Sequence, residues 1–208
     1  MAAVAGHLRA ASRNGTPVTD IAAYLAASAA AATALVVRPG AAAVERAARV
    51  VADSLAEGGQ VLFCGNGGSA ADAQHLAAEL VGRLARERPA YRAVALTTDT
   101  SVLTAVANDY GYADVFARQV QALGRRGDVL VAISTSGRSE NVLRAAAAAK
   151  QAGLAVIALL GPGHSPLDAS ADVALHVDGE MAGLIQQGHI TVGHALCMWV
   201  EARLAGSR

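Results

Sequence analysis

Residues 60–84 read QVLFCGNGGSAADAQHLAAELVGRL, and this stretch contains the unit that decides the fold. The apolar run at 60–64 indicates a buried strand, and the glycine-rich residues 65–69 indicate a tight turn. Helical patterning then continues to about Leu84. The same order recurs downstream, with strands expected at 93–96, 128–133, 155–160 and 174–177, and helices at 101–107, 114–123, 141–152 and 183–204. Strands that alternate with helices predict an α/β fold, a three-layer α-β-α sandwich around a central five-stranded parallel sheet.

Two alanine-rich helices are expected before this unit, at 19–37 and 41–57. Their apolar faces carry no polar cluster and suit packing against other helices, including those of a second subunit. Residues 1–17 end in a turn-like Asn-Gly-Thr-Pro cluster and are predicted to form a flexible N-terminal tail. The remaining residues, 18–208, suit a single domain, because chains usually divide only beyond about 250 residues.

The composition argues against several classes of protein. Hydrophobic residues make up 53% and charged residues 16%, which is typical of a globular chain with a large core. Lys+Arg and Asp+Glu both number 17, so we expect no nucleic-acid partner. No uninterrupted apolar run reaches the ~18 residues of a membrane span, and we expect no membrane partner. The two cysteines, Cys64 and Cys197, lie in apolar contexts, which favours a reducing, cytoplasmic location.

The first candidate site is the glycine-rich turn at 65–69. Glycines allow a sharp turn and a close approach of backbone amides to a ligand, and the helix that follows adds a partial positive charge. A dinucleotide-binding loop is the alternative interpretation. It is disfavoured because the glycines follow the pattern G-x-G-G rather than G-x-G-x-x-G, and no acidic residue ends a strand about 20 positions later.

The second candidate site is a cluster of four hydroxyl side chains between the strand at 128–133 and the helix at 141–152. These are Ser134, Thr135, Ser136 and Ser139. Hydroxyl groups and helix-start amides together can surround a phosphate monoester. An ordinary N-cap is the alternative, but a cap needs only one hydroxyl. The pattern therefore favours an anion site.

Two helices carry further candidate residues. His75 and Glu79 are spaced i, i+4 and share a helix face, so they could ligate one metal ion or act as a base and its partner, although most such pairs are surface neighbours. Gln186, His189 and His194 interrupt the apolar final helix. Each of these could be an ordinary core or surface residue, and for His189 we favour that interpretation.

Taken together, four segments resemble a known family. They are CGNGGSAADAQHLAAEL (64–80), AVANDYGY (105–112), ISTSGRSENV (133–142) and IQQGHITVGH (185–194). In order and spacing they are similar to the phosphoheptose isomerases, which are sugar-isomerase (SIS) domain proteins with a flavodoxin-like sheet. The resemblance covers about residues 20–203 and departs from the family at Leu184 and Gln187, where relatives commonly have Arg and Glu.

The resemblance implies an aldose-ketose isomerase that converts D-sedoheptulose 7-phosphate to D-glycero-D-manno-heptose 7-phosphate through an enediol. Glu79 and His194 match the family's catalytic pair, and His75, Glu79, Gln186 and His194 match positions that bind one zinc ion per subunit. The implied substrate-binding residues are Asn66, Gly67, Gly68, Ser69, Glu79, Gln186, Asn108 and Asp109 in the loop after the second strand, and Ser134, Thr135, Ser136 and Ser139 around the phosphate. The family is typically a cytoplasmic homotetramer with sites built across subunit boundaries.

The chemistry itself is consistent with these residue types. A carboxylate such as Glu79 can take a carbon-bound proton, and an imidazole such as His194 can move protons at oxygen near neutral pH. Two alternatives stay open at this point. One is a non-catalytic SIS protein that binds a sugar phosphate or a replication initiator, which would not need a base and an acid together. The other is an isomerase for a different phosphosugar.

Overall fold

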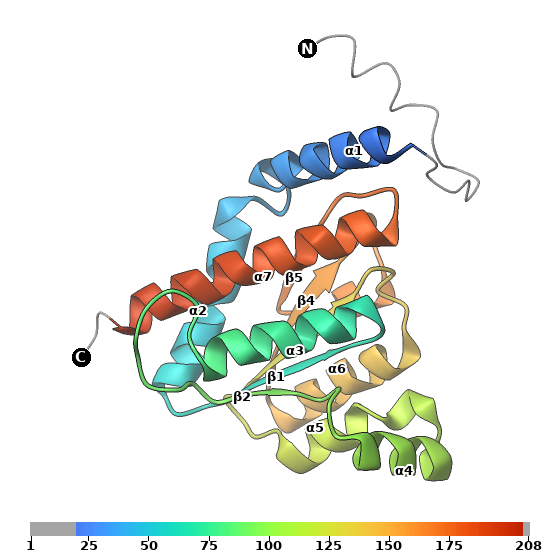
Figure 1. Cartoon of the computed structure of the whole chain (residues 1–208). Helices are drawn as coiled ribbons and strands as arrows, with labels where there is room; N and C mark the ends of the chain where they lie inside the picture. Colours follow the sequence, from blue (N-terminus) through green and yellow to red (C-terminus); the bar gives the residue numbers. More distant parts are fainter. Residues whose placement is uncertain (1–19, 206–208) are drawn as a thin grey trace.

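A computed structural model describes residues 20–205 and confirms the predicted three-layer architecture (Figure 1). All five strands are parallel, in the order β2-β1-β3-β4-β5. The strands are β1 Val61–Gly65, β2 Ala93–Ala95, β3 Val129–Ser134, β4 Ala155–Leu160 and β5 Val173–His176. The chain steps from β1 to β2 on one side and then returns to β3 on the other. The order therefore reverses at β1, where open parallel sheets bind ligands.

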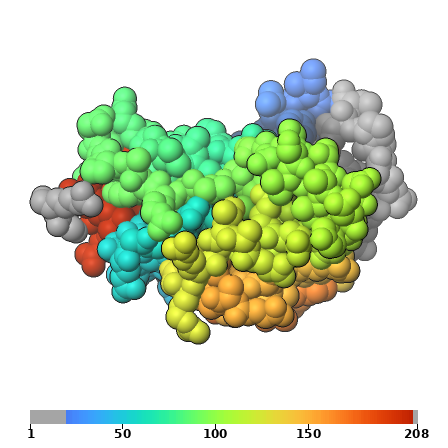
Figure 2. Space-filling view, turned by 90° about the horizontal axis from the view of Figure 1, so that it is seen from below, coloured from blue at the N-terminus to red at the C-terminus, as the bar shows by residue number. Residues whose placement is uncertain are grey.

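Helices cover both faces of the sheet. They are α1 Ile21–Ala34, α2 Ala41–Ala56, α3 Gly68–Val81, α4 Thr100–Tyr110, α5 Ala117–Leu123, α6 Glu140–Ala152 and α7 Ala182–Ala205, with short turns η2 Val36–Gly40, η3 Tyr112–Asp114 and η4 Pro166–Ser170. Alternate residues of β1 enter different cores. Phe63 packs in the core beneath α2, α3 and α7, whereas Leu62 packs in the core beneath α5 and α6. Figure 2 views the molecule from below, where the segments from α4 to α6 form much of the surface.

The strand register brings two candidate loops together. Gly65 of β1 lies opposite Ile133 of β3, so the glycine-rich turn after β1 and the hydroxyl-bearing residues after β3 leave the same edge of neighbouring strands. The third strand of this edge, β4, ends at Leu160 beside Ser134. The predicted ligand-binding edge is therefore built from the loops after β1, β3 and β4.

Several predicted boundaries were wrong. The helix after the glycine-rich turn ends at Val81 rather than near Leu84. The Arg88 guanidinium donates to the carbonyl oxygens of Glu79, Leu80 and Gly82 and so replaces the backbone amides that would bind the first two in a longer helix. The helix predicted at 114–123 is divided into η3 and α5. The predicted tail at 1–17 lies outside the described residues.

The N-terminal helices form two elements, as predicted. By length and composition alone, the helical stretch Ile21–Ala56 would suffice to cross a membrane. Its backbone, however, leaves helical geometry at Arg38 (φ −142°, ψ 117°), and α2 buries Ala47, Ala48 and Val51 in the core. By contrast, α1 has no buried residue within the described chain, and Ile21 and Leu25 are 77% and 62% exposed.

Candidate functional site

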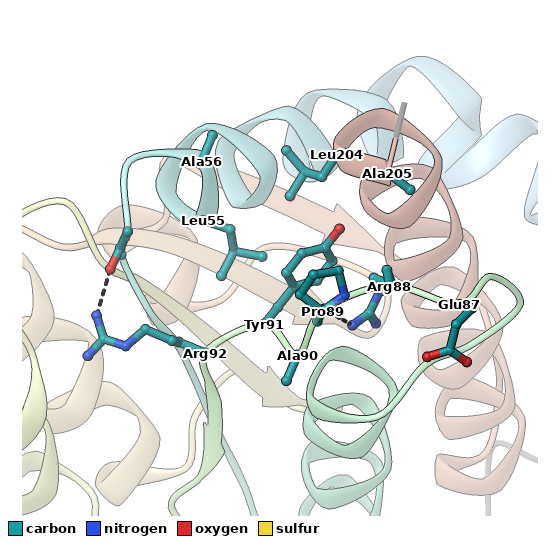
Figure 3. A pocket seen from close by; sticks show the side chains of 12 residues that line it. Leu55, Ala56, Glu87, Arg88, Pro89, Ala90, Tyr91, Arg92, Leu204 and Ala205 are labelled. Carbon is teal, nitrogen blue, oxygen red and sulfur yellow. Dashed lines mark hydrogen bonds between the residues drawn. The ribbon is translucent and has the colours of Figure 1, made fainter. Parts of the chain in front are cut away.

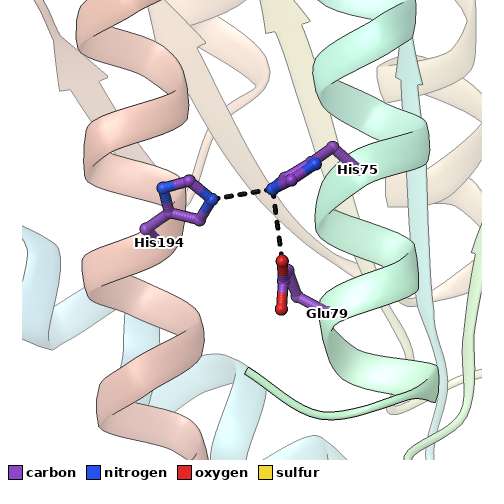
Figure 4. Close-up of side chains that lie close together, drawn as sticks. All are labelled: His75, Glu79 and His194. Carbon is purple, nitrogen blue, oxygen red and sulfur yellow. Dashed lines mark hydrogen bonds and ion pairs between the residues drawn. The ribbon is translucent and has the colours of Figure 1, made fainter. Parts of the chain in front are cut away.

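Three side chains from two helices converge between α3 and α7 (Figure 4). The Nε2 atoms of His75 and His194 lie 2.7 Å apart, and His75 Nε2 lies 3.2 Å from Glu79 Oε1. Their ligand atoms all lie within 4.8 Å of one another. The His75 side chain is 49% exposed and the Glu79 side chain 17% exposed, so the cluster is open to solvent on one side.

Close helix packing makes this convergence possible. His75 and Glu79 stand one turn apart on α3, and His194 faces them from α7. The adjacent residue on α7 is Gly193, where a Cβ atom would lie 2.5 Å from Leu76 Cδ2. Because Leu76 is buried and cannot move aside, only glycine allows α7 to approach α3 this closely.

The donor set suits a metal ion. Two imidazole nitrogens and a carboxylate oxygen are typical ligands of Zn²⁺, and catalytic sites use three protein ligands with one open position. The two Nε2 atoms and the Glu79 carboxylate lie within 4.8 Å of one another, so one ion could contact all three ligand atoms. The described residues therefore include a group that could hold a metal.

Gln186 lies at the glycine-rich turn. A Cβ atom at Gly68 would lie 2.5–2.6 Å from the amide atoms of Gln186, so residue 68 must be glycine for Gln186 to occupy this position. Gly67 precedes it with φ +56°, a left-handed conformation that favours glycine. The structure therefore brings together three predicted substrate-binding residues at the start of α3.

A network of polar side chains joins this turn to η3 and to the start of α6. Asn66 and Asn141 exchange two hydrogen bonds through their side-chain amides, each 2.9 Å long. The hydroxyl of Tyr112 donates to Asn66 Oδ1 at 3.0 Å. Ser69 is buried in the first turn of α3. This network fixes Asn66 between the glycine-rich turn and the start of α6.

The hydroxyl-bearing loop is not explained by helix capping. Ser139 occupies the N-cap position of α6, but its side chain makes no capping hydrogen bond. Ser134 is buried, accepts a hydrogen bond from the Gly137 amide at 3.1 Å and lies 3.4 Å from Ser139 Oγ. Ser136 Oγ accepts from the Arg138 amide, and Thr135 contributes its backbone carbonyl to Gly161. A hydroxyl that occupies the N-cap position without capping the helix favours the anion site over the capping alternative.

Asn108 and Asp109 lie elsewhere than predicted. They belong to α4, not to the loop after β2, and both are exposed. Asn108 Nδ2 donates to Asp109 Oδ1 at 2.8 Å. Across residues 20–205, neither side chain forms a hydrogen bond with the glycine-rich turn or the hydroxyl-bearing loop. The helix continues past Ala107 because no breaker occurs before Gly111.

The sequence analysis missed one acidic residue beside the cluster. Asp72 precedes His75 by three residues and shares its helix face. Burial raises its pKa to about 6, although nearby His75 opposes this shift. Its Oδ2 atom is buried without a hydrogen-bond partner among the described residues. The i, i+3 spacing to His75 was the signal in the sequence that could have identified it.

His189 is a core residue, as favoured, but its polar atoms are not satisfied. The side chain is fully buried on α7, and neither ring nitrogen has a hydrogen-bond partner of acceptable geometry among the described residues. Burial lowers its pKa, and the nearby Leu160 carbonyl only partly offsets this effect. The ring is therefore held neutral near pH 7.

A separate cavity of about 490 Å³ lies at the opposite edge of the sheet (Figure 3). Its wall includes Arg88, which forms an ion pair with Glu201 in which both side chains are at most 2% exposed. Burial opposes ionisation of Glu201, but the amides of residues 84–86 and Arg88 outweigh it and lower the pKa. Arg88 also donates to the Glu79 carbonyl at 2.7 Å. This pair therefore fixes the end of α3 against α7.

Comparison with known proteins identifies the family. The sequence profile of the SIS domain matches residues 23–161. Phosphoheptose isomerase of Rhodospirillum rubrum is 56% identical over 162 residues, covering 78% of this chain and 86% of that protein. The chain belongs to the SIS domain family, in the group of the phosphoheptose isomerases.

Solved structures of this group share the fold. Phosphoheptose isomerase from Neisseria gonorrhoeae superposes with a TM-score of 0.80 at 45% identity, covering 88% of this chain and 97% of that one. The enzyme from Francisella tularensis gives a TM-score of 0.84 at 37% identity, covering 90% and 99%. The family resemblance therefore extends over nearly the whole described chain.

Proposed function

We propose that this protein is an aldose-ketose isomerase that converts D-sedoheptulose 7-phosphate to D-glycero-D-manno-heptose 7-phosphate. The proposal depends on the cluster of His75, Glu79 and His194. His194 lies more than 100 residues from the other two in the sequence, yet the fold brings all three together. The similarity to proteins named phosphoheptose isomerases supports the same proposal.

The substrate's length is comparable with the distance from the start of α3, which lies at the same sheet edge as the hydroxyl-bearing loop, to His75. The helical rise places His75 about 10 Å beyond Gly68 along α3. An extended seven-carbon chain with its phosphate at one end has a comparable length. The hydroxyl-bearing loop would bind the phosphate through Ser134, Thr135, Ser136 and Ser139, while carbons 1 and 2 lie toward the cluster. Binding the remote phosphate orients the reacting carbons.

The reaction moves one proton between carbons and one between oxygens. Glu79 takes the proton from carbon 1 of the ketose and returns it to carbon 2, through an enediol. His194 moves the proton between the two oxygens. A positioned acid or base of this kind typically contributes about 10²–10⁴-fold to the rate. The partial exposure of the cluster gives the substrate access to both groups.

We further propose one zinc ion per subunit. His75, Glu79 and His194 would hold it, with Gln186 as an additional ligand reached from the start of α7. When bound, the ion would act as a Lewis acid toward the substrate oxygens. The two imidazoles and the carboxylate are the donor types that support zinc over magnesium or calcium, which prefer all-oxygen sites.

We propose a cytoplasmic homotetramer that has no nucleic-acid or membrane partner. The exposed apolar residues of α1 support assembly. So does a hollow of about 470 Å³ between α1, α2 and α7, lined mainly by apolar side chains such as Leu35, Val44, Val192 and Trp199. A second copy of the chain would cover these surfaces. Both cysteines are unpaired and buried, which fits a reducing compartment.

An activity assay after metal removal tests the function. Protein stripped by a chelator should lose turnover of sedoheptulose 7-phosphate, and added Zn²⁺ should restore it. Formation of the aldose is measured by proton NMR, because the aldose has an anomeric proton and the ketose has none. A protein that binds the sugar phosphate and zinc but yields no aldose would instead be the non-catalytic alternative.

A further inference from the structure

A second loop lies directly against the hydroxyl-bearing loop. It comprises residues 161–168, between the end of β4 and the middle of η4. The Gly161 amide donates to the Thr135 carbonyl at 3.2 Å, and the Leu167 amide donates to the Gly137 carbonyl at 3.2 Å. Gly137 has φ +61°, and a Cβ atom there would lie 2.0 Å from Ser165 Oγ. The conformation of residues 134–139 therefore depends on where residues 161–168 are held.

One side chain joins the two ends of this second loop. His176, the last residue of β5, places Nδ1 3.0 Å from the Gly161 carbonyl oxygen and Nε2 2.7 Å from Asp168 Oδ1. Both partners are acceptors. A hydrogen bond to either partner therefore needs an N–H of the His176 ring as its donor.

Asp168 connects His176 to Ser165. Its Oδ2 atom accepts hydrogen bonds from the amide and the hydroxyl of Ser165, each 2.7 Å long. Burial opposes ionisation of Asp168, but the donors of Ser165 and the neighbouring His176 outweigh it and lower the pKa of the carboxyl. The side chains of His176 and Asp168 are only 16% and 20% exposed, so solvent competes weakly for these bonds. The other titratable ring nearby is His164, whose centroid lies 6.3 Å from that of His176.

We propose that His176 and Asp168 are positioning residues, which hold loop 161–168 so that loop 134–139 keeps the shape that binds the substrate's phosphate. This inference rests on the proposed function for the identity of the anion. Neither residue contacts His75, Glu79 or His194, so their loss acts on binding of the phosphate and not on proton transfer.

We expect loss of this connection to change KM much more than kcat. Replacing His176 by glutamine leaves at most one of the two acceptors bound. We expect KM for the phosphosugar to rise about tenfold, the scale of a lost hydrogen bond to a charged group, while kcat changes less than about twofold. The inhibition constant of inorganic phosphate, measured as a competitive inhibitor, should rise by a similar factor.

The experiment compares three variants with wild-type enzyme loaded with zinc. His176→Gln and Asp168→Asn each remove part of the connection, and either one tests the proposal if the other fails to fold. His176→Arg supplies several N–H donors for the two acceptors, so it should restore KM and phosphate inhibition toward wild type. Phosphate affinity is also measured directly by calorimetry.

Lys150→Gln is the matched control. It breaks the ion pair of Lys150 with Asp172, which precedes the start of β5, at the end of this strand away from the loops. Its KM and phosphate affinity should stay at the wild-type values.

Unchanged KM and phosphate affinity in both His176→Gln and Asp168→Asn would overturn the inference, as would equal effects in the control or failure of His176→Arg to restore binding. If wild-type protein has no isomerase activity, the proposed function fails, but phosphate calorimetry on the same variants still decides this inference. Wild-type protein that does not bind phosphate at all would overturn it too.

Discussion

Glu79 is the residue on which the proposed chemistry depends most. Replacement by glutamine keeps the size of the side chain and removes its charge and its basicity. We predict that Glu79→Gln lowers kcat by at least about 10²-fold, the contribution of a positioned base. Because the side chain is partly exposed and its one ion pair is with His75, the circular dichroism spectrum and melting temperature should change little. Steady-state kinetics with zinc supplied measures the effect.

Glu87→Gln is the matched control at this scale. Glu87 is 89% exposed, pairs only with Arg83 and lies outside the cluster. Its activity should equal that of wild type. Near-normal turnover in Glu79→Gln would remove Glu79 from the mechanism.

At individual positions, the sequence predicts the chemical role of a side chain better than its burial or its neighbours. His75 and Glu79 were predictable because their i, i+4 spacing is local, and His194 followed from the family resemblance. Asp72 was missed because its burial depends on packing against other elements. Asn108 and Asp109 were placed in a loop because the predicted helix was ended at Ala107, although the first helix breaker is Gly111.

At the scale of elements, the approach of α3 to α7 sets the geometry of the cluster. Alanine usually stabilises a helix relative to glycine by up to about 1 kcal/mol. At Gly193 the added Cβ would instead push against buried Leu76 and separate the two helices. We predict that Gly193→Ala weakens zinc binding about tenfold or more, because His194 moves away from His75. Competition with a chromophoric chelator measures the affinity.

Gly183→Ala provides the comparison for this prediction. It makes the same change near the start of α7, where the added Cβ meets only the Tyr24 hydroxyl, 3.3 Å away. Its zinc affinity should match that of wild type. An equal loss in both variants would mean that helix packing at Gly193 does not control the cluster.

The ion pair of Arg88 with Glu201 joins the same two helices and makes stability depend on pH. The pKa of Glu201 in the folded state lies below the usual 4.5, so as pH falls the unfolded chain binds a proton first. The stabilisation is therefore complete above about pH 4.5 and is lost as pH falls through the folded value. We predict that Glu201→Gln costs about 3–5 kcal/mol at pH 7, because Arg88 is left buried without its counter-ion.

Urea unfolding between pH 3 and pH 8 measures this effect. The difference between wild type and Glu201→Gln should shrink toward the acid end. Glu45→Gln, which breaks an exposed ion pair with Arg49, should change stability by less than about 1 kcal/mol at any pH. A Glu201→Gln protein as stable as wild type at pH 7 would contradict the account.

The sequence predicted the order of elements well and their ends less well. Strands such as β3 were identifiable because they are continuous apolar runs, which suit a parallel sheet buried on both faces. The end of α3 was not identifiable, because the groups that bind its last carbonyls belong to Arg88, beyond the helix. Such endings depend on tertiary contacts that no local pattern encodes.

At the scale of the whole molecule, α1 presents apolar side chains that the described chain does not cover. We predict that wild-type protein is a tetramer and that Leu25→Asp shifts it to smaller species, because an aspartate at an apolar interface is costly to bury. Light scattering coupled to size-exclusion chromatography measures the mass. Ala122→Asp, at an exposed position of α5 on the other side of the sheet, should leave the mass unchanged.

The sequence indicated this surface only in general terms. Long alanine-rich faces predicted helix packing, but a composition cannot specify which copy covers which face. A Leu25→Asp protein that keeps the wild-type mass would show that α1 is not the interface.

The most direct test of the central claim, that Glu79 and His194 isomerise a phosphorylated heptose by proton transfer, is proton NMR of the reaction in D₂O with sedoheptulose 7-phosphate and zinc. We predict that the aldose forms and carries deuterium at carbon 2, because the proton held by a partly exposed Glu79 exchanges with solvent. No aldose, or aldose without deuterium at carbon 2, would contradict it.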